Sequence, residues 1–238
     1  MNRCAALLVV CALPGLAAAA SDALRPYSAS YTVSWHGMNA GTSSFTLKQE
    51  SADEWSYESR NQPRGLFSLV SMASATLHSR MSVSNAGVRP LRFTATSSSG
   101  DEVRADLQFD WAANRVSGKF EGETIDMALR AGVQDDLSVQ VALIHALLLE
   151  QPPAGIALFD HKGIRDYAYT RVGEETLHTP LGDVATVIYR SQRAYSPRST
   201  RFWCAPGYGF IPVRAEQQRE GKVEWTMELR SLKRDAAP

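Results

Sequence analysis

The sequence has little with which to cross-link itself or to hold a metal ion. Of its three cysteines, Cys4 and Cys11 fall within the first twenty residues, which we expect to be removed, so only Cys204 remains. One cysteine cannot form an internal disulfide. The five histidines are scattered, and there is no Cys-x-x-Cys or His-Glu-x-x-His motif. We therefore predict no metal site, no cofactor and a fold held by its hydrophobic core.

An excess of charge of one sign is also missing. The chain has 25 Lys and Arg residues against 25 Asp and Glu residues, and the two kinds are interspersed. Binding to nucleic acid or to an anionic membrane surface requires a basic face, so neither partner is predicted. No apolar run reaches the about 20 residues that a helix needs to cross a bilayer, and no transmembrane span is predicted.

Catalytic signatures are absent as well. The chain lacks the Gly-x-Ser-x-Gly and Ser-x-x-Lys motifs of common serine nucleophiles. It also lacks a Walker-type phosphate loop and a Gly-x-Gly-x-x-Gly dinucleotide motif. We assign no catalytic residues. The question of enzymatic activity stays open, with the balance towards a protein that is not an enzyme.

What is present begins with an export signal. Arg3 supplies a positive charge, an apolar run follows from Cys4 to Leu13, and Ala18-x-Ala20 offers the small residues that signal peptidase requires. We expect a Sec-type signal over residues 1–20, cleaved after Ala20. Residues 21–238 then form a single mainly β domain.

Cys11 raises the question of a lipid anchor. It lies in the middle of the apolar run and follows Val10, which is bulky and β-branched, whereas lipidation favours a small residue before the cysteine at the end of the run. We therefore expect a soluble periplasmic protein rather than a lipoprotein.

Alternation with a period of two dominates the remaining sequence. From Tyr27 to Trp35, aromatic and aliphatic residues alternate with serine and threonine, as in an antiparallel strand with one buried face. Turn sequences recur at roughly ten-residue spacing, which favours an antiparallel sandwich or barrel. Further strands are predicted over Thr42–Gln49, Ala75–Val83, Val88–Ser97, Glu102–Trp111, Ile164–Val172, Val184–Arg190, Pro212–Gln218 and Lys222–Leu232.

One segment has the period of a helix instead. Leu137 to Leu149 can be capped by Asp135 or Asp136 and is stopped by Pro152-Pro153. It has two apolar stripes, so most of its surface must be buried. The sequence thus predicts a mainly β fold, either a curved antiparallel sheet or an open β-barrel or half-barrel, around one buried apolar helix. The two stripes are Leu137, Val141, Ile144 and Leu148, and Val139, Leu143 and Leu147.

Candidate binding residues are few. His145 lies on the apolar helix and is either a hydrogen-bonded core residue or a polar group that points into a ligand cavity. Tyr31, Trp35, Trp203 and Arg214 are further pocket candidates, although ordinary core packing explains the aromatic residues equally well.

Five segments, taken in order, resemble exported bacterial proteins grouped as domain of unknown function 3108. The resemblance spans about Tyr27 to Leu232 and implies a Gram-negative periplasmic protein with a curved antiparallel sheet. It brings no established activity and no catalytic residues. The segments are Tyr31-x-Val33-x-Trp35-x-Gly37-x-x-Ala40-Gly41, Asp136-Leu137-Ser138-Val139, Thr179-Pro180-Leu181-Gly182, Trp203-x-Ala205-Pro206 and Ile211-Pro212-Val213-Arg214.

Three functions fit these features. The leading hypothesis is a binding or accessory module for an apolar, lipid or cell-envelope component, because curved sheets and barrel mouths hold such ligands. The second is a hydrolase or transferase of envelope polymers, in which His145, Asp136 and Cys204 would converge in one cleft. The third is a structural or assembly partner of another envelope protein, bound at an exposed sheet edge.

Overall fold

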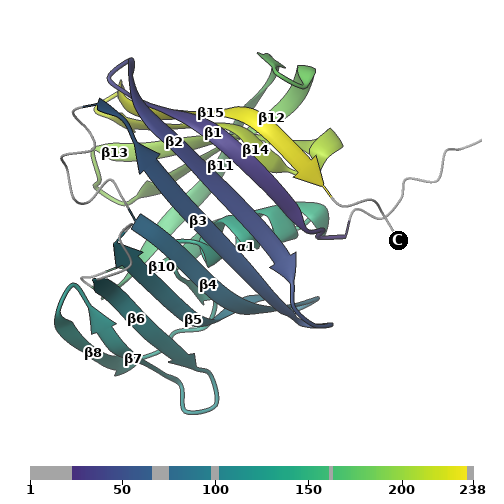
Figure 1. Cartoon of the computed structure of the whole chain (residues 1–238). Coiled ribbons are helices and arrows are strands. Elements are labelled where there is room, and N and C mark those ends of the chain that lie inside the picture. The colour runs from purple at the N-terminus through teal and green to yellow at the C-terminus, as the bar shows by residue number, and fades with distance from the viewer. Residues whose placement is uncertain (1–22, 66–74, 98–101, 161–162, 235–238) are drawn as a thin grey trace, which may run out of the picture.

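Fifteen strands form one open sheet in the computed structural model, which describes residues 23–65, 75–97, 102–160 and 163–234. The expected signal peptide over residues 1–20 lies outside the described residues. The sheet curls so that its second half passes behind its first (Figure 1). One α-helix, α1 (Ser138–Leu148), lies between the two halves, and the 3-10 turn η3 (Pro206–Tyr208) follows β13. The predicted mainly β class with one helix is confirmed.

The strand order divides the sheet into two halves. In the first half, the strands are β1 (Tyr27–Trp35), β2 (Met38–Gln49), β3 (Glu54–Pro63), β4 (Ala75–Ser84), β5 (Gly87–Ser97), β6 (Val103–Asp110), β7 (Arg115–Phe120) and β8 (Glu123–Ala128). In the second half, they are β9 (Val133–Gln134), β10 (Gly155–Asp160), β11 (Gly163–Thr179), β12 (Gly182–Arg193), β13 (Arg198–Ala205), β14 (Ile211–Arg219) and β15 (Lys222–Arg234).

Nearly every neighbouring pair in the sheet is also consecutive in the chain. The exception that joins the halves is the antiparallel pair of β1 with β15, in which Tyr27 faces Arg234 and Trp35 faces Trp225. The short β9 pairs with β10 in parallel, while the other strand pairs are antiparallel. β8 and β9 stand at the two ends of the strand order, so the sheet is not closed by hydrogen bonds.

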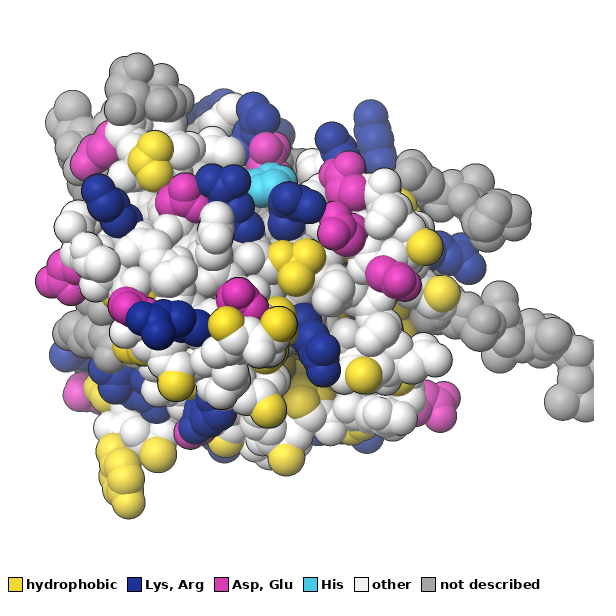
Figure 2. Space-filling view, turned by 90° about the horizontal axis from the view of Figure 1, so that it is seen from below, with side chains coloured by type: hydrophobic (Ala, Val, Ile, Leu, Met, Phe, Trp, Pro, Cys, Tyr) yellow, Lys and Arg dark blue, Asp and Glu magenta, His cyan; other side chains and the backbone are white. Residues whose placement is uncertain are grey.

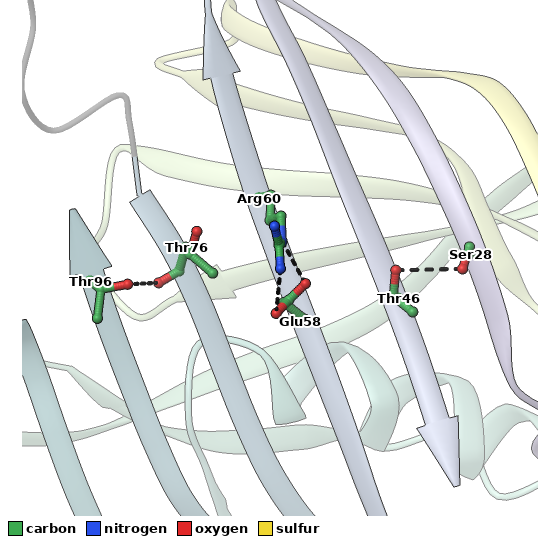
Figure 3. Close-up of polar contacts among 6 residues, drawn as sticks. All are labelled: Ser28, Thr46, Glu58, Arg60, Thr76 and Thr96. Carbon is green, nitrogen blue, oxygen red and sulfur yellow. Dashed lines mark hydrogen bonds and ion pairs between the residues drawn. The ribbon is translucent and has the colours of Figure 1, made fainter. Parts of the chain in front are cut away.

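The outer face of the first half is polar because serine, threonine and charged residues occupy alternate positions of its strands. Figure 3 shows hydrogen bonds and an ion pair between neighbouring residues of β1 to β5 on this face. The Ser28 hydroxyl donates to Thr46 at 3.4 Å, and the Arg60 guanidinium is paired with Glu58 at 2.7 Å. In the view from below, basic and acidic side chains are mixed and the hydrophobic ones are scattered (Figure 2).

The inner face of the first half carries a cluster of aromatic rings. Tyr27, Tyr31, Phe45 and Tyr57 are buried and contact one another, with Phe45 stacked on Tyr57 at 5.8 Å between ring centroids. The hydroxyl groups of Tyr27 and Tyr57 are 2.8 Å apart, and Tyr57 donates onward to the Gln140 side chain at 3.2 Å. This chain of hydrogen bonds connects the sheet to α1. It also gives the buried hydroxyl groups of both tyrosines a hydrogen-bond partner.

The two apolar stripes predicted for the helix bury against two separate clusters. Val141 and Ile144, which are 0% and 1% exposed, belong to the large cluster that contains the inner face of the first half. Leu143 and Leu147 pack in a second cluster with Tyr169, Tyr189 and Cys204 of the second half, with Val139 against them. The helix therefore fills the space between the halves, as the sequence predicted.

The start of α1 is fixed by a buried carboxylate. Asp135, 1% exposed, accepts the main-chain N–H groups of Leu137 and Ser138 at 2.9 and 2.8 Å, and the Ser79 hydroxyl of β4 at 2.7 Å. The Ser138 hydroxyl in turn accepts the Asp135 N–H at 2.9 Å. Of the two aspartates predicted as caps, Asp135 performs this role, which satisfies otherwise unpaired N–H groups. Burial raises the pKa of Asp135, and these hydrogen bonds oppose the rise.

Among the predicted strands, β2 and β11 show the largest shift of one end, and β2 begins at Met38 instead of Thr42. The strand expected to end at Val172 continues as β11 to Thr179, because an irregularity between Arg171 and Gly173 shifts the register and lets the pairing with β12 resume. β9, only two residues long, was not predicted at all. Within the described ranges, no helix has the length and apolar character required to cross a membrane.

Candidate functional site

A cavity of about 510 Å³ opens beside α1 and is lined by residues from both halves of the sheet. Four segments that are distant in sequence meet there: the β4–β5 turn, the residues before β9, one side of α1, and the start of β10. The volume falls in the range of small-molecule and peptide pockets. It is lined by Asn85, Ala86, Gly87, Val88, Arg130, Ala131, Gly132, Gln134, Ala142, His145, Ala146, Leu149, Gln151, Pro153, Gly155, Ile156, Ala157 and Asp166.

His145 lines this cavity from α1 and is 9% exposed. Its Nε2 lies 2.9 Å from the main-chain oxygen of Ser84 at the end of β4. Because a carbonyl oxygen only accepts, Nε2 must carry the proton, which leaves Nδ1 of the neutral ring as an acceptor. Nδ1 is buried and has no hydrogen-bond partner among the described residues.

Gln134 of β9 offers a second acceptor of the same kind. Its side-chain Nε2 donates to the main-chain oxygens of Val88 at 2.8 Å and Gly132 at 3.3 Å, so the orientation of the amide is set. The remaining atom, Oε1, is buried and finds no partner in the described part of the chain, although Gln134 is only 3% exposed. A buried polar atom without a partner costs about 1–3 kcal/mol, so two in one cavity call for an explanation.

The start of β10 adds open main-chain groups. Tyr169 donates its N–H to the Ala154 oxygen at 2.9 Å, and hydrogen-bonded pairs alternate along an antiparallel ladder. The N–H and C=O of Gly155, one position further and opposite Ala168, therefore point away from β11. On that side β9 pairs only with Ala157 and Leu158, so no described strand covers Gly155.

An ion pair between two exposed side chains lies at the mouth of the cavity. Arg130 and Asp166 form a two-pronged ion pair with distances of 3.0 and 2.5 Å, and both side chains are substantially exposed. Their charges cancel, so the mouth has no strong preference for an anion or a cation. The lining contains many alanines and glycines and no Phe, Tyr or Trp. Space is therefore left for a ligand backbone to approach closely.

Of the five predicted pocket residues, His145 alone lines this cavity. Tyr31 is in the interior, where its hydroxyl donates to the Pro212 oxygen at 2.8 Å and its ring meets Phe45 edge-on. Trp35 is 45% exposed at the end of β1, with its ring 4.2 Å from that of His36. The alternation of β1 thus loses its burial before the strand ends, because the strand runs past the core.

Trp203 and Arg214, also predicted, contact each other at a separate place in the second half. They face each other across β13 and β14, with the guanidinium carbon of Arg214 5.0 Å from the Trp203 ring centroid. The Trp203 indole N–H donates to Glu175 of β11 at 2.7 Å, and Arg214 is paired with buried Glu216 at 3.0 Å. Each charge in this row has a partner, so the row links β11, β13 and β14.

The three residues considered for hydrolase chemistry have different surroundings. Cys204 is fully buried in the second cluster, and burial raises the pKa of its thiol to about 12, so the reactive thiolate is disfavoured. His145 is bonded to Ser84. Asp136 is exposed next to the helix-capping Asp135. No hydrogen bond or ion pair among the described residues joins any two of the three, and no group of three or more metal-ligating side chains occurs among those residues.

Among the described residues, the packing beside the core end of α1 is much tighter. Where Leu24 meets Ile144 and Leu148 of the helix, a gap of only about 10 Å³ remains. Because α1 and the aromatic cluster occupy the concave face, a lipid inside the sheet has no support from the packing. A shallow hollow of about 330 Å³ lies against Glu174–Thr176 and Ala185–Val187, the β11–β12 hairpin.

Sequence reasoning missed most of the cavity. Gln134 lies in a segment with no periodic pattern. Gly155 lies shortly after Pro152-Pro153, where the sequence indicates only the end of a loop. Neither has a local signal, because both acquire their role only when β9, β10 and the β4–β5 turn come together. His145 was detectable because a polar ring on an apolar helix is conspicuous in sequence.

A family model of proteins of unknown function (DUF3108) matches residues 30–223. The chain belongs to this family, as the ordered segments suggested. A search of the curated proteins gave no match.

Two solved structures match the chain at low similarity. One is MucB in complex with MucA(peri), with 10% sequence identity and a TM-score of 0.35 over 92% of this chain. This chain corresponds to only 53% of the length of that one. The other is a protein from Bacteroides fragilis NCTC 9343 that has a YmcC-like fold and is presumed to be exported, with 9% identity and a TM-score of 0.34. That match covers 88% of this chain and 96% of the other.

Proposed function

We propose that the protein is a non-catalytic binding or accessory module of the periplasm, and that its ligand occupies the cavity beside α1. The observation that carries the proposal is the pair of buried acceptors, Gln134 Oε1 and His145 Nδ1, in one cavity without partners. Native proteins pair nearly all such atoms, so two of them in one cavity call for a group that completes their bonding.

The packing narrows the kind of ligand that the leading hypothesis allows. The interior is filled by α1, so a lipid carried within the sheet is not part of the proposal. The rim cavity is instead lined by a mixture of polar and small apolar groups. A ligand that is itself polar, and that belongs to the cell envelope or to a partner protein there, fits this lining better than a hydrocarbon chain.

The periplasmic address rests on the sequence of residues 1–20, which has the three parts of a Sec-type signal. Fractionation of cells that produce the full chain, with detection of the shortened mature form in the periplasmic fraction, tests the address. Retention of the full-length chain in the membrane fraction would contradict it.

The function is tested by purifying the protein from the periplasm and measuring its mass under native conditions. Three chains are compared: the natural sequence, Ala146→Trp, which fills the cavity from α1, and Ala113→Trp, which places the same side chain on the exposed β6–β7 turn. We expect added mass on the natural chain and on the Ala113 variant, and none on the Ala146 variant. Equal spectra for all three chains would sink the proposal.

A further inference from the structure

We propose that the ligand of this cavity is an extended polypeptide segment of another protein, bound as an added strand beside Gly155 of β10. This inference rests on the proposed function, because it names the chemical class of the ligand for the same site. It uses three features of the cavity: two acceptors, one open strand edge, and a lining of small side chains.

The two acceptors require a ligand that donates. Gln134 Oε1 can only accept, and His145 Nδ1 is an acceptor in the neutral ring, since Nε2 of each side chain already donates to a main-chain oxygen. A carboxylate or phosphate ligand would bring further acceptors and leave both atoms unsatisfied. The ligand must carry at least two N–H or O–H groups.

The edge of β10 requires a ligand that both donates and accepts. The Gly155 N–H and C=O point away from β11 and have no strand beside them in the described part of the chain. An extended peptide supplies one acceptor and one donor to such a residue, as strand addition to a sheet edge does elsewhere. β9 already covers Ala157 and Leu158, so the added segment would continue the row that β9 begins.

These two requirements fit one ligand because main-chain groups alternate in direction along a strand. Residues of the added segment that bond to Gly155 leave the N–H groups of their neighbours directed to the opposite side. We infer that these N–H groups reach Gln134 and His145 across the cavity. A single backbone thus supplies donors on both of its edges.

The residues that line the cavity favour a peptide over a saccharide, which is the other class of ligand with many hydrogen-bond donors. Sugar rings are usually held against aromatic faces, and the cavity has no Phe, Tyr or Trp in its lining. Ala86, Gly87, Ala142 and Ala146 leave the backbone of a strand room to approach, whereas larger side chains would hold it away. The neutral Arg130–Asp166 pair at the mouth places no charge requirement on the sequence of the segment.

The test selects random peptides displayed on phage against the mature natural chain and measures the affinity of the best binder by calorimetry. The same peptide is then made with single N-methyl groups along its backbone. Each methyl group that removes an N–H bonded in the cavity should weaken binding about tenfold or more. Along the peptide, the sensitive positions should alternate between N–H groups that face Gly155 and N–H groups that face Gln134 and His145. This comparison leaves the protein unchanged, so it does not depend on how variants fold.

Ala146→Trp should abolish peptide binding, and Ala113→Trp should leave it intact. His145→Leu should weaken it about tenfold, and hydrogen exchange of the Gly155 amide should slow when the peptide is bound. Equal affinity for the Ala146 variant, or an unprotected Gly155 amide, would overturn the inference. If peptides fail while envelope saccharides bind the natural chain but not the Ala146 variant, the inference is wrong and the proposed function stands. If neither class binds, both fail.

Discussion

The two sides of α1 do different things, although the same short helix carries both. The core side, Val141 and Ile144, is sealed from solvent by the inner face of the sheet. The cavity side, Ala142, His145 and Ala146, lines an open space and holds a polar atom without a partner. The comparison teaches that stability and binding are assigned to different faces of one element. Changes on the first face should cost stability, and changes on the second should cost binding.

The largest effect on stability is expected on the core side. Ile144→Ala removes a side chain that is 1% exposed, and large-to-small changes at such positions cost about 2–5 kcal/mol. The matched change on the cavity side, Leu149→Ala, concerns a half-buried side chain and should cost clearly less. Urea unfolding of both variants measures the difference. Equal losses would remove the distinction between the two sides.

The second-largest loss of stability is expected when the residue that caps α1 is replaced. Asp135→Ala removes the acceptor for two N–H groups at the start of α1 and for Ser79, and should lower the free energy of unfolding by about 1–3 kcal/mol. Asp135→Asn keeps an acceptor for the helix and can donate to Ser79, so it should retain most of the stability. A loss for the asparagine variant as large as for alanine would show that the charge itself is required.

The same pair of variants gives a pH dependence. Burial raises the pKa of Asp135 in the folded protein, so the folded state binds the proton more tightly than the unfolded chain. The free energy of unfolding should therefore fall as pH rises from about 4, the ordinary carboxylate range, through the raised pKa. Asp135→Asn lacks this group, so its stability relative to the natural chain should improve over that interval. A constant difference from acid to neutral pH would contradict the expectation.

His145→Leu should change stability by no more than about 1 kcal/mol. The variant loses the hydrogen bond from Nε2 to the Ser84 oxygen and also loses the unpaired Nδ1, and these two consequences oppose each other. Urea unfolding and the peptide titration, measured on the same preparation, should show near-natural stability with weakened binding. A large loss of stability would show that His145 serves mainly to stabilise the fold, as Val141 and Ile144 do.

The smallest effect is expected at the mouth. Arg130→Gln breaks an ion pair whose two side chains are 48% and 76% exposed, and such surface pairs contribute within about 1 kcal/mol. Stability should be unchanged within error, and binding of an uncharged peptide should change little. A strong salt dependence of binding in the natural chain, lost in the variant, would show that the mouth selects charge after all.

The sequence predicted those parts of the molecule that depend on short-range pattern. Alternation located most strands, and the two stripes of the helix correctly indicated burial on both sides. Position along the chain could not reveal which strands meet at the cavity, because Gln134 and Gly155 owe their surroundings to partners far away in sequence. The extension of β11 past Arg171 was missed since an irregular register interrupts the alternation that marks a strand.

The pairing of β1 with β15 sets an order of assembly. The two halves of the sheet meet through a pair whose members lie at opposite ends of the described chain, with Tyr27 opposite Arg234. Because synthesis of a chain begins at its N-terminus, β1 is made long before β15 exists. Closing so long a loop is slow. Until β15 pairs with β1, the first half of the sheet keeps an exposed strand edge and an uncovered apolar face. The pairing of this last strand therefore ends the period in which the first half can aggregate or be bound by chaperones.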